Sequence, residues 1–124
     1  MVGKYKVITL CGSTKFKDDF IREQKRLSLE GNIIISVGLF GHSGDNEVWD
    51  NDTKEMLDDM HKRKIDMADE IFVINKGGYI GSSTKSEIEY AIAHGKKSKL
   101  YGKHRQIKTK NTKWNYLVFF YVIL

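Results

Sequence analysis

The chain has 124 residues, a formal net charge of +5 and one cysteine. This length fits one domain with a hydrophobic core and is too short for two. A single cysteine excludes a disulfide framework within the chain and fits a reducing cytosol, where we expect the protein to act. The first ten residues contain no long apolar segment before a small-residue cleavage site, so we expect no secretory signal.

The positive charge lies near the C-terminus and not in the body of the chain. Residues 1–95 hold all sixteen acidic residues and thirteen basic ones, which gives −3, and the other eight basic residues lie between Lys96 and Lys113. The body shows no basic face interleaved with aromatic residues, as nucleic-acid binders have. A nucleic-acid partner is therefore not expected.

The first half of the chain predicts a strand, a helix and a second strand. Residues 4–10 alternate and then turn apolar, which is typical of a strand in a sheet. A helix is expected over 15–30, ended by Gly31. The unbroken apolar run over 32–38 predicts a strand buried on both faces. Residues 39–52 lack periodicity, and a loop of this length usually has a function as a lid or binding loop.

The second half continues the alternation. A capping box from Asp52 to Glu55 is expected to open the next helix. The remaining predicted elements are a helix over 53–67, a strand over 70–75, a helix over 84–94 and a strand over 97–101. Strands that alternate with helices indicate an α/β fold, here a small doubly wound, Rossmann-like or flavodoxin-like parallel sheet of four to five strands flanked by helices, in a domain spanning 1–101.

Residues 102–124 form a basic and then apolar tail. Its last nine residues, 116–124, are all apolar, which is far short of the ~20 that a membrane helix needs, so no membrane association is expected. An extra strand or an oligomer contact is the expectation, because an exposed strand of this composition would aggregate. An unnatural extension of the reading frame is the alternative.

Three polar loops that contain glycine follow the predicted strands, at 11–14, 39–52 and 77–84. Doubly wound folds bind ligands outside the carboxyl ends of their strands, so these loops are expected to converge on one site. In the first loop, Gly12 allows close backbone approach to a ligand. Ser13 and Thr14 can either cap the following helix or bind a phosphate at its positive end, and the Walker A and G-x-G-x-x-G spacings are absent.

The loop at 77–84 leads into a helix that carries two glutamates. Ser82, Ser83 or Thr84 can cap this helix, and Glu87 can complete a capping box with Thr84. The alternative is that Glu87 points into the pocket. Glu89 lies about 200° further around the helix, so only one of the two glutamates can serve the site.

The second predicted helix and the long loop supply further candidate residues. Asp58 and His61 share a helical stripe, and a carboxylate beside an imidazole is a common acid–base arrangement, although the basic residues that follow His61 favour a surface position for it. In the long loop, Phe40 and His42 can close over a base or a sugar. Cys11 is expected to be a small buried thiol and not a nucleophile. No pair of His, Cys or Asp has convincing metal-ligand spacing, so neither a metal nor another cofactor is expected.

The segments ITLCGST, KIDMADEIFVIN and SSTKSEIEYAIAHGKK together resemble the nucleoside 2-deoxyribosyltransferase-like family, which includes deoxynucleoside monophosphate N-glycosidases. The resemblance covers residues 4–101. Its most specific part is the last segment, where the family has a Gly-Thr or similar pair, two residues, Glu, an aliphatic residue, Gly, any residue and Ala, followed by Gly-Lys. This chain has Ser83-Thr84, Glu87 and Ala91 at the matching positions, and then Gly95.

The resemblance implies that Glu87 is a nucleophile. It would attack the anomeric carbon of the 2-deoxyribosyl group of a small-molecule nucleoside or nucleotide. The base would depart, and a second base or water would take the sugar. A proton donor is needed near the leaving group, as in retaining glycosidases, and Asp58 or His61 would supply it.

Two of the polar loops are expected to bind the substrate. The residues expected to line the sugar or phosphate are Gly12, Ser13, Thr14, Gly81, Ser83 and Thr84. Members of the family often complete the pocket with residues from a neighbouring subunit, so a homo-oligomer is expected.

Three positions depart from the family pattern. His61 stands where the family usually has an aspartate, and Gly81 stands where many transferases of the family have a second aspartate. Glu89 replaces a glycine of the motif. These departures weaken the expectation of transfer between ordinary deoxynucleosides and leave a nucleotide or a modified nucleoside as the substrate.

Two alternatives remain open. The stretch GGYIGSSTKSE is also similar, with an insertion, to the glycine-rich motif of the lysine-decarboxylase-like nucleotide phosphoribohydrolases, which would make its glycines phosphate ligands and keep Glu87 at the sugar. The other alternative is a non-catalytic nucleotide-binding or sensor domain, since one fold can host many functions.

Overall fold

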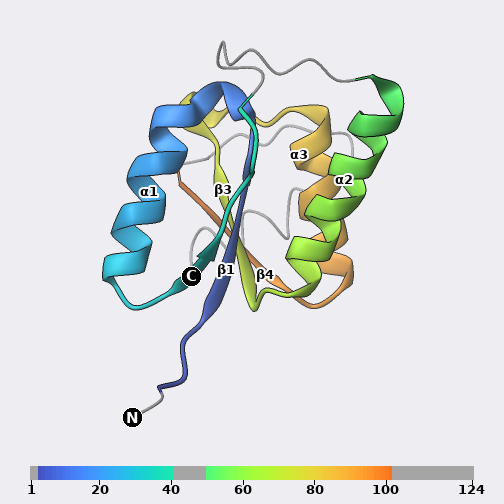
Figure 1. The fold of residues 1–124 in the computed structure, drawn as a ribbon. Helices are drawn as coiled ribbons and strands as arrows, with labels where there is room; N and C mark the ends of the chain where they lie inside the picture. Colours follow the sequence, from blue (N-terminus) through green and yellow to red (C-terminus); the bar gives the residue numbers. More distant parts are fainter. Residues whose placement is uncertain (1–2, 41–49, 102–124) are drawn as a thin grey trace.

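The computed structural model describes residues 3–40 and 50–101. Within these residues four parallel strands form one sheet in the order β2-β1-β3-β4 (Figure 1). The strands are β1 (Val7–Gly12), β2 (Ile33–Ile35), β3 (Glu70–Ile74) and β4 (Lys97–Leu100). The predicted α/β doubly wound class is therefore confirmed. The predictions for residues 102–124 fall outside the described residues.

Helices cover both faces of the sheet. Helix α1 (Lys17–Leu29) lies on one face, and α2 (Asn51–Asp66) and α3 (Ser82–Ala93) lie on the other (Figure 1). Single 3-10 turns, η1 (Thr14–Phe16) and η3 (Lys76–Gly78), follow β1 and β3. In the part of the chain that the structure describes, no helix combines the length and the apolar character needed to cross a membrane.

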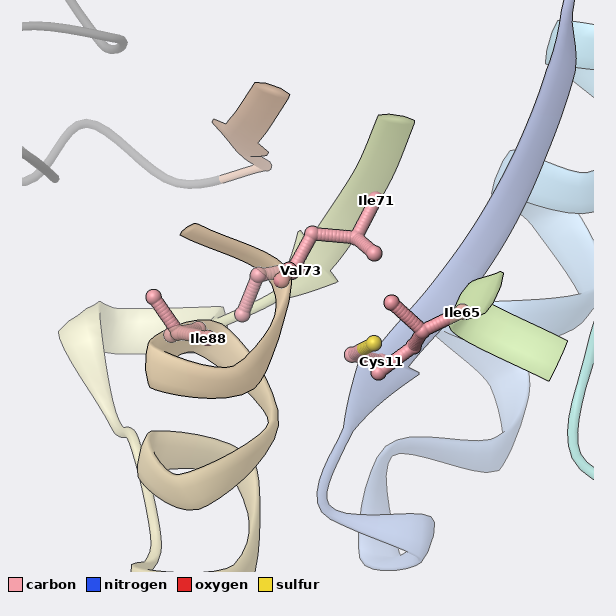
Figure 2. Packing of buried hydrophobic residues seen from close by; sticks show 6 residues of the cluster. Cys11, Ile65, Ile71, Val73 and Ile88 are labelled. Atoms are coloured by element: carbon pink, nitrogen blue, oxygen red, sulfur yellow. The ribbon is translucent and has the colours of Figure 1, made fainter. Parts of the chain in front are cut away.

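The core divides in two because successive side chains of a strand point to opposite faces of the sheet. On the α1 face the buried cluster comprises Ile8, Leu10, Phe20, Leu27, Phe72 and Ile74. On the other face it comprises Cys11, Ile65, Ile71, Val73, Ile88 and Ala91, and Figure 2 shows its members gathered from β1, α2, β3 and α3. The alternation thus directs Cys11 toward α2 and α3, and it confirms that this thiol is buried.

The strand order reverses between β1 and β3. The chain moves from β1 to β2 on one side and then to β3 and β4 on the other. The carboxyl ends of the two central strands lie side by side, since Gly12 is the register partner of Ile74. Ligands of doubly wound folds bind outside such a reversal point.

Gly12 is required by the packing of these two strand ends. Its φ is +142°, and a Cβ atom added to it would lie 2.6 Å from the backbone oxygen of Ile74. A side chain at this position would combine an unfavourable backbone angle with a clash against main chain. The glycine therefore lets β1 and β3 approach closely where the first polar loop begins.

Two predictions about the strands were wrong. The first strand begins at Val7 and runs through Gly12, so it lies further along the chain than 4–10. The second strand is only Ile33–Ile35, at the sheet edge, and Ile33 is 49% exposed. Strand β2 pairs only with β1, so its other edge has no neighbouring strand and it is less enclosed than the central strands.

The predicted Asp52–Glu55 capping box was wrong, and of the two alternatives for Glu87 the capping box with Thr84 is not formed. Helix α2 begins at Asn51, and the Oδ1 atom of Asp50 accepts the hydrogen bond from the Thr53 N–H at 2.8 Å. Helix α3 begins at Ser82 with Gly81 as its N-cap, so Thr84 lies inside the first turn, where it is buried. The cap of α2 therefore stands two residues earlier than expected, and Glu87 is free of a capping role.

Candidate functional site

A cavity of about 490 Å³ opens at the carboxyl edge of β1 and β3. This volume lies in the range of roughly 300–1,000 Å³ that small-molecule sites occupy. Its walls come from the loop after β1, from residues 37–39 after β2, from α2, and from the start of α3. The loops at 11–14 and 77–84 therefore meet as predicted, whereas Leu39 is the one described residue of the 39–52 loop that lines the cavity.

Most of the predicted site residues line this cavity. They are Gly12, Ser13, Thr14, Asp58, His61, Gly81, Ser83, Thr84 and Glu87. Phe40 is not among the lining residues: its ring packs edge-on against Phe20 on the α1 face, with centroids 5.6 Å apart. The position of His42 lies outside the described residues.

Glu87 lies in the second turn of α3 with its side chain largely enclosed. The side chain is 15% exposed, and its Oε1 atom is 3.7 Å from Nε2 of His61. Burial, and secondly the negative charge of Asp58, raise the pKa of Glu87 from 4.5 to about 7. Glu89 is exposed, which confirms that only one of the two glutamates can serve the site.

His61 is buried, so the expected surface position was wrong. It lies one turn before Ile65, which is fully buried, and the two share the stripe of α2 that faces the sheet. Burial, and then the charge of Lys64, lower the pKa of His61 to about 4. At neutral pH the imidazole is uncharged, so its contact with Glu87 is not an ion pair and it carries no spare proton for a leaving group.

Cys11 completes this group, although its predicted role was only packing. Its Sγ atom lies 3.3 Å from Nε2 of His61, and the side chain is fully buried. Burial, and then the charge of Glu87, raise the pKa of the Cys11 thiol well above its usual range. The thiol therefore stays protonated and is not a nucleophile. No local sequence signal links these residues, because they lie on β1, α2 and α3.

Basic side chains surround the outer part of the cavity. Lys15, Lys54 and Lys64 line it. Lys54 forms a 2.8 Å ion pair with Asp58, whose side chain is 51% exposed. Lys15 places its Nζ atom 3.5 Å from the ring centroid of Tyr79. These three lysines supply positive charge, partly offset by Asp58, that favours an anionic or phosphate-bearing ligand.

The start of α3 adds to the attraction for an anion. Its N-cap residue, Gly81, has no side chain with which to cap the first-turn N–H groups, and that turn contains no acidic residue. Gly81, Ser82, Ser83 and Thr84 all line the cavity. Uncapped N–H groups and the positive end of the helix dipole together favour a negatively charged group.

No protein-family model matches this chain, and no curated protein sequence matches it. The resemblance to the nucleoside 2-deoxyribosyltransferase-like family therefore stays a prediction that depends on the three quoted motifs.

Proposed function

We propose that the protein binds a nucleoside or nucleotide in this cavity and cleaves or transfers its N-glycosidic bond, with Glu87 as the nucleophile. The observation that carries the proposal is the position of Glu87, a largely enclosed carboxylate on a helix at the wall of a cavity of ligand size. The resemblance in the SSTKSEIEYA segment supports the same residue.

The cavity lining offers polar and basic groups that can bind the polar parts of the substrate. Ser13 and Thr14 after β1 and the uncapped start of α3 suit a phosphate or sugar hydroxyls. Lys15 and Lys54 supply positive charge at the same cavity. These groups favour a nucleotide over an uncharged nucleoside.

The chemistry requires Glu87 to be ionised. Its carboxylate forms a bond to the anomeric carbon while the bond from that carbon to the base nitrogen breaks. The departing base takes a proton from water, because Asp58, a carboxylate paired with Lys54, has none to donate. A second base or a water molecule then displaces Glu87. His61, uncharged and with its Nε2 atom 3.7 Å from the carboxylate, lies beside Glu87 in the cavity lining.

The decisive experiment follows base release from a panel of deoxynucleosides and their monophosphates by chromatography. We expect Glu87→Gln to abolish release and Glu89→Gln to retain it, because Glu89 lies on the exposed side of the same helix. Equal rates for Glu87→Gln and wild type would remove Glu87 from the chemistry.

A second function, nucleotide binding without turnover, is favoured by Gly81. Many transferases of the resembling family carry an aspartate at this position, and here the cavity wall has no side chain. Saturable nucleotide binding by calorimetry, with no base released over prolonged incubation, would select this function.

We infer a homo-oligomeric, cytosolic protein from the resemblance and from the single cysteine. Sedimentation at several protein concentrations tests the assembly, and a monomer at every concentration would contradict it.

A further inference from the structure

Three side chains with different donor atoms meet at the inner wall of the cavity. Cys11 of β1, His61 of α2 and Glu87 of α3 each present one ligand atom, and these atoms all lie within 4.8 Å of one another. The Sγ–Nε2 distance is 3.3 Å and the Nε2–Oε1 distance is 3.7 Å. All three side chains are buried or largely enclosed, unlike the exposed acidic groups that commonly cluster at protein surfaces.

The spacing of the donor atoms fits a tetrahedral cation. Zinc binds sulfur, nitrogen and oxygen ligands at about 2.0–2.3 Å, so two ligands at a tetrahedral angle lie about 3.4–3.6 Å apart. The observed 3.3 and 3.7 Å separations differ from these values by a few tenths of an ångström. The separation between the Cys11 and Glu87 donor atoms lies within 4.8 Å, so the side chains must move together by at most about 1 Å to hold one ion.

The chemistry of the donors selects the kind of ion. A thiolate with an imidazole and a carboxylate suits Zn²⁺, whereas Mg²⁺ and Ca²⁺ prefer oxygen ligands throughout. Binding releases the proton of the Cys11 thiol, and that of Glu87 where it is protonated, to solvent. The two resulting negative charges neutralise the dication, so the enclosed site stays uncharged overall.

We propose that Cys11, His61 and Glu87 form a three-ligand site for Zn²⁺ with its fourth position open to the cavity. His61 and Glu87 line the cavity. Cys11 belongs to the buried apolar cluster that includes Ile65 and Val73 (Figure 2). Three protein ligands and one open position are the arrangement of zinc sites that bind a water or a ligand group.

The metal site and the proposed nucleophile use the same carboxylate. A Glu87 oxygen that coordinates Zn²⁺ cannot attack a sugar, so bound zinc should inhibit base release and a chelator should restore it. The base-release assay is accordingly run on chelator-treated protein. The test of the metal site uses no activity measurement, so failure of either proposal leaves the other untouched.

The test titrates the full chain, first stripped with chelator, with Co²⁺ as a coloured substitute for Zn²⁺. Tetrahedral cobalt bound to a thiolate gives a near-ultraviolet charge-transfer band, and Cys11 is the only thiol in the sequence. We expect this band to saturate at one equivalent, to disappear when Zn²⁺ is added, and to be absent in Cys11→Ser. Glu87→Gln and His61→Gln should each weaken cobalt binding by at least tenfold.

His94→Gln is the matched control. His94 is exposed, and its Nδ1 atom lies 2.8 Å from the backbone oxygen of Tyr90, outside the cluster. It should leave cobalt binding unchanged, and far-ultraviolet circular dichroism verifies that each variant folds. No charge-transfer band in wild type would overturn the proposal. So would unchanged cobalt affinity in folded Glu87→Gln and His61→Gln.

Discussion

Replacing Glu87 by glutamine should change how the stability of the protein depends on pH. The folded protein holds the Glu87 carboxyl neutral up to about pH 7, whereas the unfolded chain ionises it above pH 4.5. Between these two values the folded state binds one proton more than the unfolded state. The free energy of unfolding therefore falls as pH rises through this window.

The size of the effect follows from the width of the window. A change of one pH unit is worth about 1.4 kcal/mol for one proton, so Glu87 costs the wild type about 3 kcal/mol above pH 7. The side chain is only 15% exposed, so screening by solvent reduces this figure little. It is a large part of the roughly 5–15 kcal/mol that stabilises a typical domain.

His61 has the opposite effect on the wild type. Its pKa is lowered from 6.5 to about 4 in the folded protein. Between these two pH values the unfolded chain binds a proton at His61 and the folded protein does not. This lowers stability as pH falls from 6.5 to about 4. Between pH 4.5 and 6.5 the opposite pH dependences of Glu87 and His61 cancel. These two groups together should therefore leave the free energy of unfolding of the wild type unchanged in that range.

The assay is urea unfolding followed by far-ultraviolet circular dichroism from pH 4.5 to about pH 8. We expect the stability of Glu87→Gln relative to wild type to increase by about 3 kcal/mol over this range, while Glu89→Gln, on the exposed side of α3, runs parallel to wild type. A difference between Glu87→Gln and wild type that does not vary with pH would refute the reasoning.

Three other outcomes are expected. Gly12→Ala should lower the free energy of urea unfolding by about 2–4 kcal/mol, because the new Cβ meets the Ile74 oxygen at 2.6 Å. Gly38→Ala, with open space around it, should lower it far less. Equal losses would contradict the close approach of β1 and β3. Asp50→Ala should lower the free energy of unfolding by about 1 kcal/mol, because it removes the cap of α2. A larger loss for Asp52→Ala in the same experiment would support the Asp52–Glu55 capping box instead. If base release occurs, its rate should fall about tenfold per pH unit below about pH 7 as Glu87 becomes protonated, and a rate independent of pH would exclude this nucleophile.

The order of elements was predictable because each one has a local signal. An alternating and then apolar segment marked β1, an apolar run marked β3, a glycine marked the end of α1, and alternation of strands with helices fixed the class. The edge position of β2 was not predictable, since an apolar run reports hydrophobicity and not the number of neighbouring strands. The cap of α2 was placed two residues too late because Asp50 and Asp52 both offer a suitable carboxylate within three residues.

The candidate site was predictable in outline and not in its inner wall. The polar loops follow strands, so their convergence follows from topology alone. The burial of His61 was hidden by its basic neighbours, although its spacing of four residues before Ile65 was the better guide. Cys11, His61 and Glu87 meet through pairs separated by 50 and 26 positions, and no local pattern in a single sequence encodes such a contact.

The place of Cys11 in the fold also makes it a built-in reporter of opening. It is the chain's only thiol, and none of its surface is accessible in the folded state. A thiol reagent can modify it only in molecules whose central strand has separated from α2 and α3. The labelling rate, compared with that of an unfolded peptide, then gives the free energy of that separation without an engineered probe.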